Sequence, residues 1–211
     1  MSDADRPLNI ATLPSFGMRW LAPRLPALTV AHPEIVISFA ARADMFDLAE
    51  DGYDAAVHFG NDDWPGAAHD LLFRERAIPV LAPGLLATHP IRSEADFASL
   101  PLLSQAARRG AWRDWLAERG IAPPVDPVGL IFEHFLMLAQ AAAAGVGAAL
   151  LPSFLIEPEM AAGTLVAPLP SSTATPGAYW LVYPPDRLDD RRFQRFRDWV
   201  LAEARSMTIA S

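Results

Sequence analysis

The chain has 211 residues, of which 52% are hydrophobic and 20% charged, so it can bury a sizeable core and is not expected to be disordered. Its formal net charge of −8 is spread along the sequence, which argues against direct binding of nucleic acid, because phosphate contacts need clustered basic residues. The absence of cysteine excludes disulfides and thiolate metal sites, and together with polar N-terminal residues unlike a signal peptide it favours a cytoplasmic location.

The first third of the chain predicts alternating strands and helices. The expected elements are a strand at 8–13, a helix at about 16–31, a strand at 34–41, a short helix at 45–50 and a strand at 53–60. Phe16, Trp20 and Leu28 recur at helical spacing, and Ser15 is a candidate N-cap for the first helix.

The rest of the chain continues the same alternation. The expected elements are strands within 71–83, a helix at 112–120, a strand at 126–132, an Ala-rich helix at 134–144, a strand at 178–185 and a terminal helix at about 189–204. The apolar stretch 135–156 is interrupted by Gln140, Gly145 and Pro152, which favours a buried helix, turn and strand over a membrane span. Such an order predicts parallel sheets whose ligands lie beyond the carboxyl ends of strands.

Nine short segments occur in an order that is specific when taken together. They are ATLPSFGMRWLAPRL at 11–25, HPEI at 32–35, YDAAVHFG at 53–60, WPG at 64–66, IPVLAP at 78–83, WRDWL at 112–116, LAQAAAAGVGAALLP at 138–152, GTLV at 163–166 and FRDWV at 196–200. This pattern resembles the effector-binding domain of LysR-type transcriptional regulators, especially the subgroup of the glycine-cleavage activator and the β-lactamase regulator.

The resemblance implies an α/β fold of two Rossmann-like lobes joined by two crossover segments, similar to type 2 periplasmic binding proteins. Lobe I is then expected at 7–75 and 168–205, and lobe II at 76–167. The crossing segments would act as a hinge. In that family a winged helix-turn-helix and a linker helix precede the sensing domain. Neither is recognised before Asp5, so DNA is expected to be bound only through a part absent from this chain.

A small polar effector is expected between the lobes, at the starts of two helices. In lobe I the turn from the first strand offers free backbone N–H groups and two hydroxyls, and in lobe II Phe132 leads into the matching turn. Ser15 is either an ordinary cap or a ligand contact, and the resemblance favours the contact. The candidate effector-binding residues are Thr12, Leu13, Pro14, Ser15, Arg42, His58, Ser104, Gln105, Glu133, His134, Phe135 and Tyr179.

Three of these candidates have an alternative interpretation. Many family members carry Arg near position 58, where this chain has His58, and the difference weakens an expectation of carboxylate recognition. A histidine there is charged mainly below about pH 6.5, and it could instead hydrogen-bond within the strand end. Arg42 could form a solvated ion pair, and Tyr179 is equally consistent with the core and with the pocket.

Enzyme chemistry has no support in the sequence. Nucleophile-elbow, zinc-protease, P-loop and dinucleotide-binding motifs are all absent, and the five histidines lack metal-ligand spacing, so we expect no catalysis, no cofactor and no metal. Two alternatives to a sensing domain stay open. A periplasmic solute-binding protein would need an export signal, and an enzyme on the same scaffold would show turnover.

The resemblance also implies a homodimer in which the helix at 16–31 packs against the helix at 134–144 of the partner chain. Met18 and Leu25 add apolar bulk to the first helix, and the alanines of 139–144 would allow close approach. In the competing interpretation both faces are buried within their own lobes.

Overall fold

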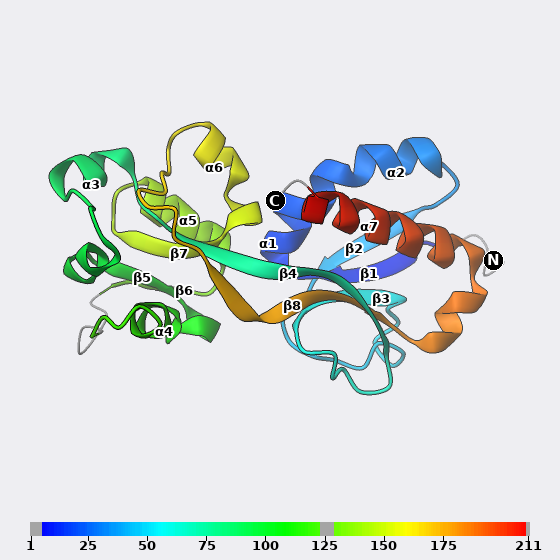
Figure 1. Ribbon diagram of the computed structural model, residues 1–211. Helices are drawn as coiled ribbons and strands as arrows, with labels where there is room; N and C mark the ends of the chain where they lie inside the picture. Colours follow the sequence, from blue (N-terminus) through cyan, green and yellow to red (C-terminus); the bar gives the residue numbers. More distant parts are fainter. Residues whose placement is uncertain (1–5, 123–128, 210–211) are drawn as a thin grey trace. The chain divides into compact units, whose positions relative to one another are not determined.

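The computed structural model describes residues 6–122 and 129–209, and the chain divides into two compact units (Figure 1). Unit 1 comprises Met1–Glu75 and Thr175–Ser211, and unit 2 comprises Arg76–Ala174. Each unit combines strands with helices, as the sequence predicts. Within the described residues, no helix is both long and apolar enough to cross a membrane.

The sheet of unit 1 has the strand order β2-β1-β3-β8. These strands are β2 (Ile37–Ala41), β1 (Leu8–Thr12), β3 (Ala55–Gly60) and β8 (Thr173–Tyr183). The first three are parallel and β8 runs antiparallel to β3. The carboxyl ends of β1, β2 and β3 therefore lie at one edge of the sheet, where parallel sheets place their ligands.

The first helix of unit 1 is irregular. It consists of α1 (Pro14–Phe16), a π turn at Gly17–Leu21, a 3₁₀ turn at Ala22–Arg24 and α2 (Leu25–Ala31). Pro23 and Pro26 lack the N–H that a regular helix needs, which explains the interruptions. The prediction that Ser15 is the N-cap is wrong, because α1 begins at Pro14 and Leu13 occupies the capping position without a side-chain cap.

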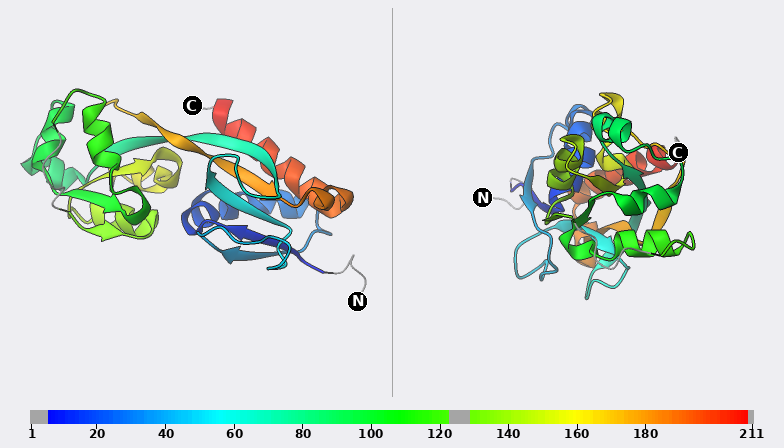
Figure 2. Two further views of the ribbon diagram at one scale, coloured as in Figure 1. Left: turned by 90° about the horizontal axis from the view of Figure 1, so that it is seen from below. Right: turned by 90° about the vertical axis from the view of Figure 1, so that its left-hand side faces the viewer.

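The terminal helix α7 (Arg191–Ile209) packs on unit 1 as predicted, with Phe193, Phe196 and Val200 buried. Figures 1 and 2 show this helix on one face of the unit 1 sheet, while the loops that follow β2 and β3 lie on the other face. The helix expected at 45–50 is a turn instead, because the Asp47 carboxylate accepts the backbone N–H groups of Ala49 and Glu50 and so competes with helix formation.

The strands of unit 2 follow the order β4-β7-β5-β6. They are β4 (Ala68–Val80), whose residues up to Glu75 belong to unit 1, β7 (Ala148–Pro152), β5 (Leu102–Gln105) and β6 (Ile131–Phe132). The strand expected at 126–132 is thus described only at its end, since 123–128 lie outside the described residues. The helices of unit 2 are α3 (Pro83–Thr88), α4 (Ala111–Ala117), α5 (Phe135–Ala143) and α6 (Glu157–Ala161).

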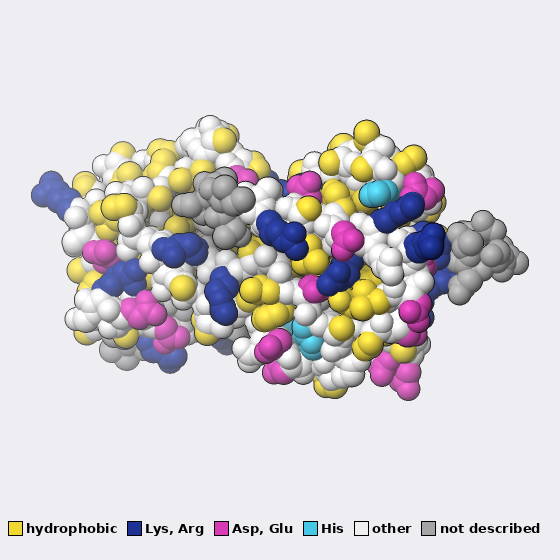
Figure 3. All heavy atoms as spheres, turned by 45° about the vertical axis from the view of Figure 1, so that its right-hand side comes forward, with side chains coloured by type: hydrophobic (Ala, Val, Ile, Leu, Met, Phe, Trp, Pro, Cys, Tyr) yellow, Lys and Arg dark blue, Asp and Glu magenta, His cyan; other side chains and the backbone are white. Residues whose placement is uncertain are grey.

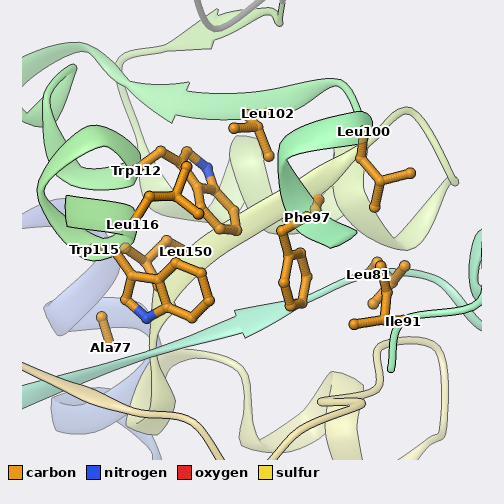
Figure 4. Close-up of a cluster of buried hydrophobic side chains, with 11 residues drawn as sticks. Ala77, Leu81, Ile91, Phe97, Leu100, Leu102, Trp112, Trp115, Leu116 and Leu150 are labelled. Carbon is orange, nitrogen blue, oxygen red and sulfur yellow. The ribbon is translucent and has the colours of Figure 1, made fainter. Parts of the chain in front are cut away.

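An aromatic cluster forms the core of unit 2 beneath α4. Phe97, Trp112 and Trp115 are each at most 2% exposed, and their ring centroids lie 5.5 to 5.6 Å apart (Figure 4). The indole N–H of Trp112 donates to the carbonyl of Leu103 at 3.0 Å, which satisfies its buried polar group. This cluster fixes α4 against β5, the strand that leads into the candidate effector residues.

The chain passes from unit 1 to unit 2 within β4, after Glu75, and returns after Ala174 within β8. The chain thus re-enters unit 1 at Thr175, later than residue 168, where the second segment of lobe I was predicted to start. Contacts made by residues 171–173 explain the difference. The hydroxyl of Thr173 donates to Glu118 at 2.8 Å, and Arg119 donates to the hydroxyl of Ser171, so this segment is bound to unit 2.

Candidate functional site

The expected lobe I residues form a continuous turn at the end of β1. Thr12 and Ser15 are 6% and 8% exposed, and the Thr12 hydroxyl donates to the carbonyl of Leu13. The N–H of Arg42 donates to the carbonyl of Thr12 at 3.0 Å, and Thr12 pairs with Ala41 across the two strands. The ends of β1 and β2 therefore meet at this turn.

Gly17 determines how closely the first helix approaches Thr12. A Cβ atom at this glycine would lie 2.8 Å from Cγ2 of Thr12, closer than side chains tolerate. A larger residue would push the helix away from the Thr12 hydroxyl. Gly17 thus permits the close approach of the first helix to Thr12, which the sequence analysis missed, although a glycine in an apolar helix was a signal.

A pocket of about 290 Å³ adjoins this turn, entirely within unit 1. Thr12 contributes the only side-chain hydroxyl among the residues that line this pocket. The other lining residues are apolar: Pro14, Gly17, Met18, Leu21, Ala22, Leu25, Phe39, Ala40 and Ala41. The pocket thus combines one hydroxyl with a broad apolar wall.

His58 lies on the face of the sheet that carries the loops. Its ring packs edge-on against Trp64, with ring centroids 5.2 Å apart. Burial lowers the pKa of His58, and while Asp63 opposes this effect, His69 adds to it. The lowered pKa disfavours the charged imidazole, so His58 is a poor replacement for the positive charge of an arginine there.

Arg42 and Tyr179 both have partners within unit 1. A guanidinium nitrogen of Arg42 lies 3.2 Å from the Asp51 carboxylate, as the ion-pair interpretation predicted, and its Cζ lies 4.3 Å from the Phe46 ring centroid. Tyr179 is 3% exposed and its hydroxyl donates to the equally buried Glu75 at 2.9 Å. Tyr179 therefore occupies the core of unit 1, as one of its two interpretations predicted.

In unit 2 the expected residues meet where β5 and β6 end. Gln105 pairs with Phe132, and its side-chain amide donates to the carbonyl of Glu133 at 2.8 Å. Ser104 is buried, whereas Glu133 and His134 are exposed just before α5, which begins at Phe135. Five of the candidate residues are thus brought together within this unit: Ser104, Gln105, Glu133, His134 and Phe135.

Arg108 belongs to the same group, and the sequence analysis missed it. It ends the 3₁₀ turn Ala106–Arg108 that follows β5, and its Cζ lies 4.9 Å from the ring centroid of Phe135. The signal in the sequence was its place three residues after Gln105. Among the described residues, no group of three or more His, Asp or Glu is arranged to hold a metal ion.

Figure 3 shows arginine and acidic side chains interspersed on the face in view, without a continuous basic surface. The face in view therefore lacks the extended basic surface that binding of nucleic acid requires.

The chain is similar to known proteins of one family. The sequence model of the LysR substrate binding domain family matches residues 2–205 of this chain. The glycine cleavage system transcriptional activator of Escherichia coli (strain K12) is 33% identical over 198 residues, which are 93% of this chain and 65% of the activator. The transcriptional regulator TrpI of Pseudomonas aeruginosa is 35% identical over 202 residues, 93% of this chain and 67% of the regulator.

Solved structures show the same fold. The effector domain of the transcriptional regulator AmpR of Pseudomonas aeruginosa superposes with a TM-score of 0.87 at 27% identity, over 97% of this chain and 98% of that domain. The chain spans 65% of the length of the glycine cleavage activator, so it corresponds to part of such a regulator. With the family model matching nearly its whole length, the chain belongs to the LysR substrate-binding domain family.

Proposed function

We propose that this chain senses a small polar effector and controls DNA binding by another part of a cytoplasmic transcriptional regulator. The observation that carries the proposal is the turn from Thr12 to Ser15, where both hydroxyl residues are buried and Thr12 meets the end of β2. The relatives named above are transcriptional regulators, which supports this role. The net charge of −8 favours DNA contact through a separate domain.

Each unit holds its own group of candidate effector residues. In unit 1, the hydroxyls of Thr12 and Ser15 would donate to or accept from polar atoms of the ligand. In unit 2, the ends of β5 and β6 would supply Gln105 and the exposed residues before α5. Catalysis is not part of this role.

We expect the double substitution Thr12→Val and Ser15→Ala to weaken effector binding by about 1 to 3 kcal/mol, because buried ligand atoms would lose their hydrogen-bond partners. Both replacements nearly preserve volume, so the fold should be retained. Calorimetry with the small molecule that native mass spectrometry identifies on the unsubstituted domain measures the change. Unchanged affinity would place the site elsewhere.

We also propose that the chain forms a symmetric homodimer, as the resemblance implied. On the first helix Met18 is 57% exposed, beside the apolar pocket that Leu25 and Phe39 line. On α5 Met137 is also 57% exposed. Exposed apolar side chains of this kind mark interaction surfaces when they adjoin an apolar groove, and twofold symmetry would use each surface twice.

The structure changes which residues of α5 could take part. Ala139 and Ala142 are fully buried within unit 2, so the expectation of an exposed alanine surface at 139–144 is wrong at these two positions. The exposed side of α5 carries Met137 and Gln140 instead, and Ala144 is exposed directly after the helix. A charge at Ala142 would therefore disrupt the core and would not test the interface.

We expect sedimentation at micromolar concentration to give about twice the mass of 22.9 kDa. Met18→Glu and Met137→Glu should each produce monomers, because each would place charges in an apolar contact. Met45→Glu is the matched control, because Met45 is 52% exposed on a loop outside the proposed interface. A monomeric unsubstituted chain, or dimers that survive both substitutions, would refute the proposal.

A further inference from the structure

Unit 1 has a second pocket, which lies apart from the candidate effector residues. Its volume is about 420 Å³, and it is lined by residues of the loops after β2 and β3 and by Pro184, which follows β8. None of the candidate effector residues lines this loop pocket. Figure 2 shows the two loops on the face of the unit 1 sheet opposite α7. A pocket of this size can hold a small molecule.

Much of the wall of the loop pocket is apolar and aromatic, with Met45, Phe46 and Trp64 among the lining residues. Trp64 is 6% exposed, and its ring centroid lies 5.3 Å from that of Phe46. The N–H of Trp64 donates to Nε2 of His69 at 3.0 Å, and the ring of His58 packs edge-on against the indole. These contacts fix Trp64 in advance, so a ligand that binds beside it has little ordering left to impose.

One charged side chain, that of Asp47, lines the loop pocket. Its Oδ1 atom accepts the backbone N–H groups of Ala49 and Glu50 at 2.9 and 2.8 Å, which holds the carboxylate in place. Within residues 6–122 and 129–209, no arginine forms an ion pair with Asp47, and the chain has no lysine. Arg42 is engaged with Asp51 instead, at 3.2 Å. The negative charge of Asp47 therefore has no counterpart in the described part of the chain.

The two histidines that support Trp64 do not neutralise this charge. Nε2 of His69 accepts the N–H of Trp64, so the imidazole of His69 is uncharged in this arrangement. Burial lowers the pKa of His58, which disfavours its charged form. An apolar wall beside an uncompensated carboxylate fits a cation with alkyl substituents, because its carbon groups can contact the wall while its charge faces the carboxylate.

We propose that the loop pocket is a second binding site of unit 1 and that it binds a small organic cation, an alkylated ammonium, through Trp64, Phe46 and Asp47. Aromatic rings attract such cations, and the indole of tryptophan does so most strongly. An anion would be repelled by Asp47, and a neutral molecule of the same shape would lose the attraction of both the carboxylate and the rings. The site shares no residue with the effector turn, so this inference extends beyond the sensing function.

The test is titration of the isotope-labelled 211-residue chain with choline chloride at pH 7, with ionic strength held constant by sodium chloride. We expect saturable shifts of the amide resonances of 45–49, 64, 66 and 67. The comparison ligand is dimethylbutanol, the isostere of choline in which carbon replaces the charged nitrogen. It should bind at least about fivefold more weakly than choline, because it keeps the shape and loses the charge.

Asp47→Asn should weaken choline binding about threefold to fivefold, the most that an ion pair exposed to water is expected to contribute, and leave dimethylbutanol binding unchanged. Asparagine keeps the side-chain oxygen that accepts the two backbone N–H groups, so the turn should be retained. Glu50→Gln is the matched control, because Glu50 is an exposed acidic residue of the same loop that does not line the pocket, and it should alter choline binding less than about twofold.

Phe46→Leu tests the aromatic wall separately from the charge. Leucine keeps an apolar side chain at this position and removes the ring, so choline binding should weaken more than dimethylbutanol binding does. The dispersion of the amide resonances shows whether each variant retains the fold.

Four results would overturn the inference: shifts that fail to saturate, shifts confined to other parts of the chain, equal affinity for choline and dimethylbutanol, or equal effects of Asp47→Asn and Glu50→Gln. The sensing function is tested at Thr12 and Ser15, which lie outside the loop pocket. Either site can therefore fail its test while the other stands.

Discussion

Phe97→Ala should destabilise unit 2 by about 3 to 5 kcal/mol, the range for truncating a fully buried phenylalanine. Phe97 is 0% exposed and contacts the rings of Trp112 and Trp115, so a cavity would open between two large aromatic groups that cannot readily collapse into it (Figure 4). A capping box fixes the turn that carries Phe97, since backbone N–H groups of Arg92 and Ser93 donate to Asp96 and lower the pKa of that carboxyl. The neighbouring chain therefore cannot easily follow the missing ring.

Amide hydrogen exchange measures this effect unit by unit. Protection should fall in β5 and α4, while β1 and β3 of unit 1 should keep their protection. Leu130→Ala is the control within unit 2, because Leu130 is 57% exposed and its truncation should cost less than about 0.5 kcal/mol. Equal loss of protection in both units would show that they unfold as one, contrary to their separate cores.

Asp54→Asn should destabilise unit 1 by about 2 to 3 kcal/mol. The Asp54 side chain is 2% exposed and accepts hydrogen bonds from Arg6 at 2.6 Å, Arg187 at 3.1 Å and the N–H of Asn9 at 2.8 Å. Breaking a buried ion pair costs about 3 to 5 kcal/mol. The cost is lower here because the two arginine side chains are 30% and 31% exposed and can be rehydrated.

Asp186→Asn provides a matched comparison, because Asp186 also lies near Arg187, at 3.8 Å, but is 69% exposed. Screening by water should keep its cost below about 0.5 kcal/mol. Urea unfolding of the unsubstituted chain, Asp54→Asn and Asp186→Asn measures the differences in the free energy of unfolding. Similar midpoints for Asp54→Asn and Asp186→Asn would mean that the buried carboxylate contributes little to stability.

Much of the fold could be predicted from the sequence because apolar periodicity reflects burial directly. Phe193, Phe196 and Val200 recur at helical spacing and are buried in α7. The stop of α5 was also predictable, because Gly145 adopts a φ of 82° that favours glycine. The irregular course of the first helix was missed, since periodicity does not show how Pro23 and Pro26 redistribute backbone hydrogen bonds.

The candidate site was predicted less completely, for a physical reason. The turn from Thr12 to Ser15 is local, so its residues could be named from a strand followed by a helix. The stacking of Arg108 on Phe135 joins residues that are far apart in the sequence, and it depends on the pairing of β5 with β6. Contacts of this kind arise from tertiary structure, which a single sequence does not reveal.

The most direct test of the sensing function is native mass spectrometry of the purified chain incubated with fractionated bacterial metabolites, compared with the Thr12→Val and Ser15→Ala double variant. We expect one fraction to add a single small mass to the unsubstituted chain and to add it far less to the variant, because the hydroxyls at the end of β1 hold the ligand. An adduct of equal occupancy on both proteins would contradict the assigned site, and the absence of any adduct across the fractions would contradict the sensing function itself.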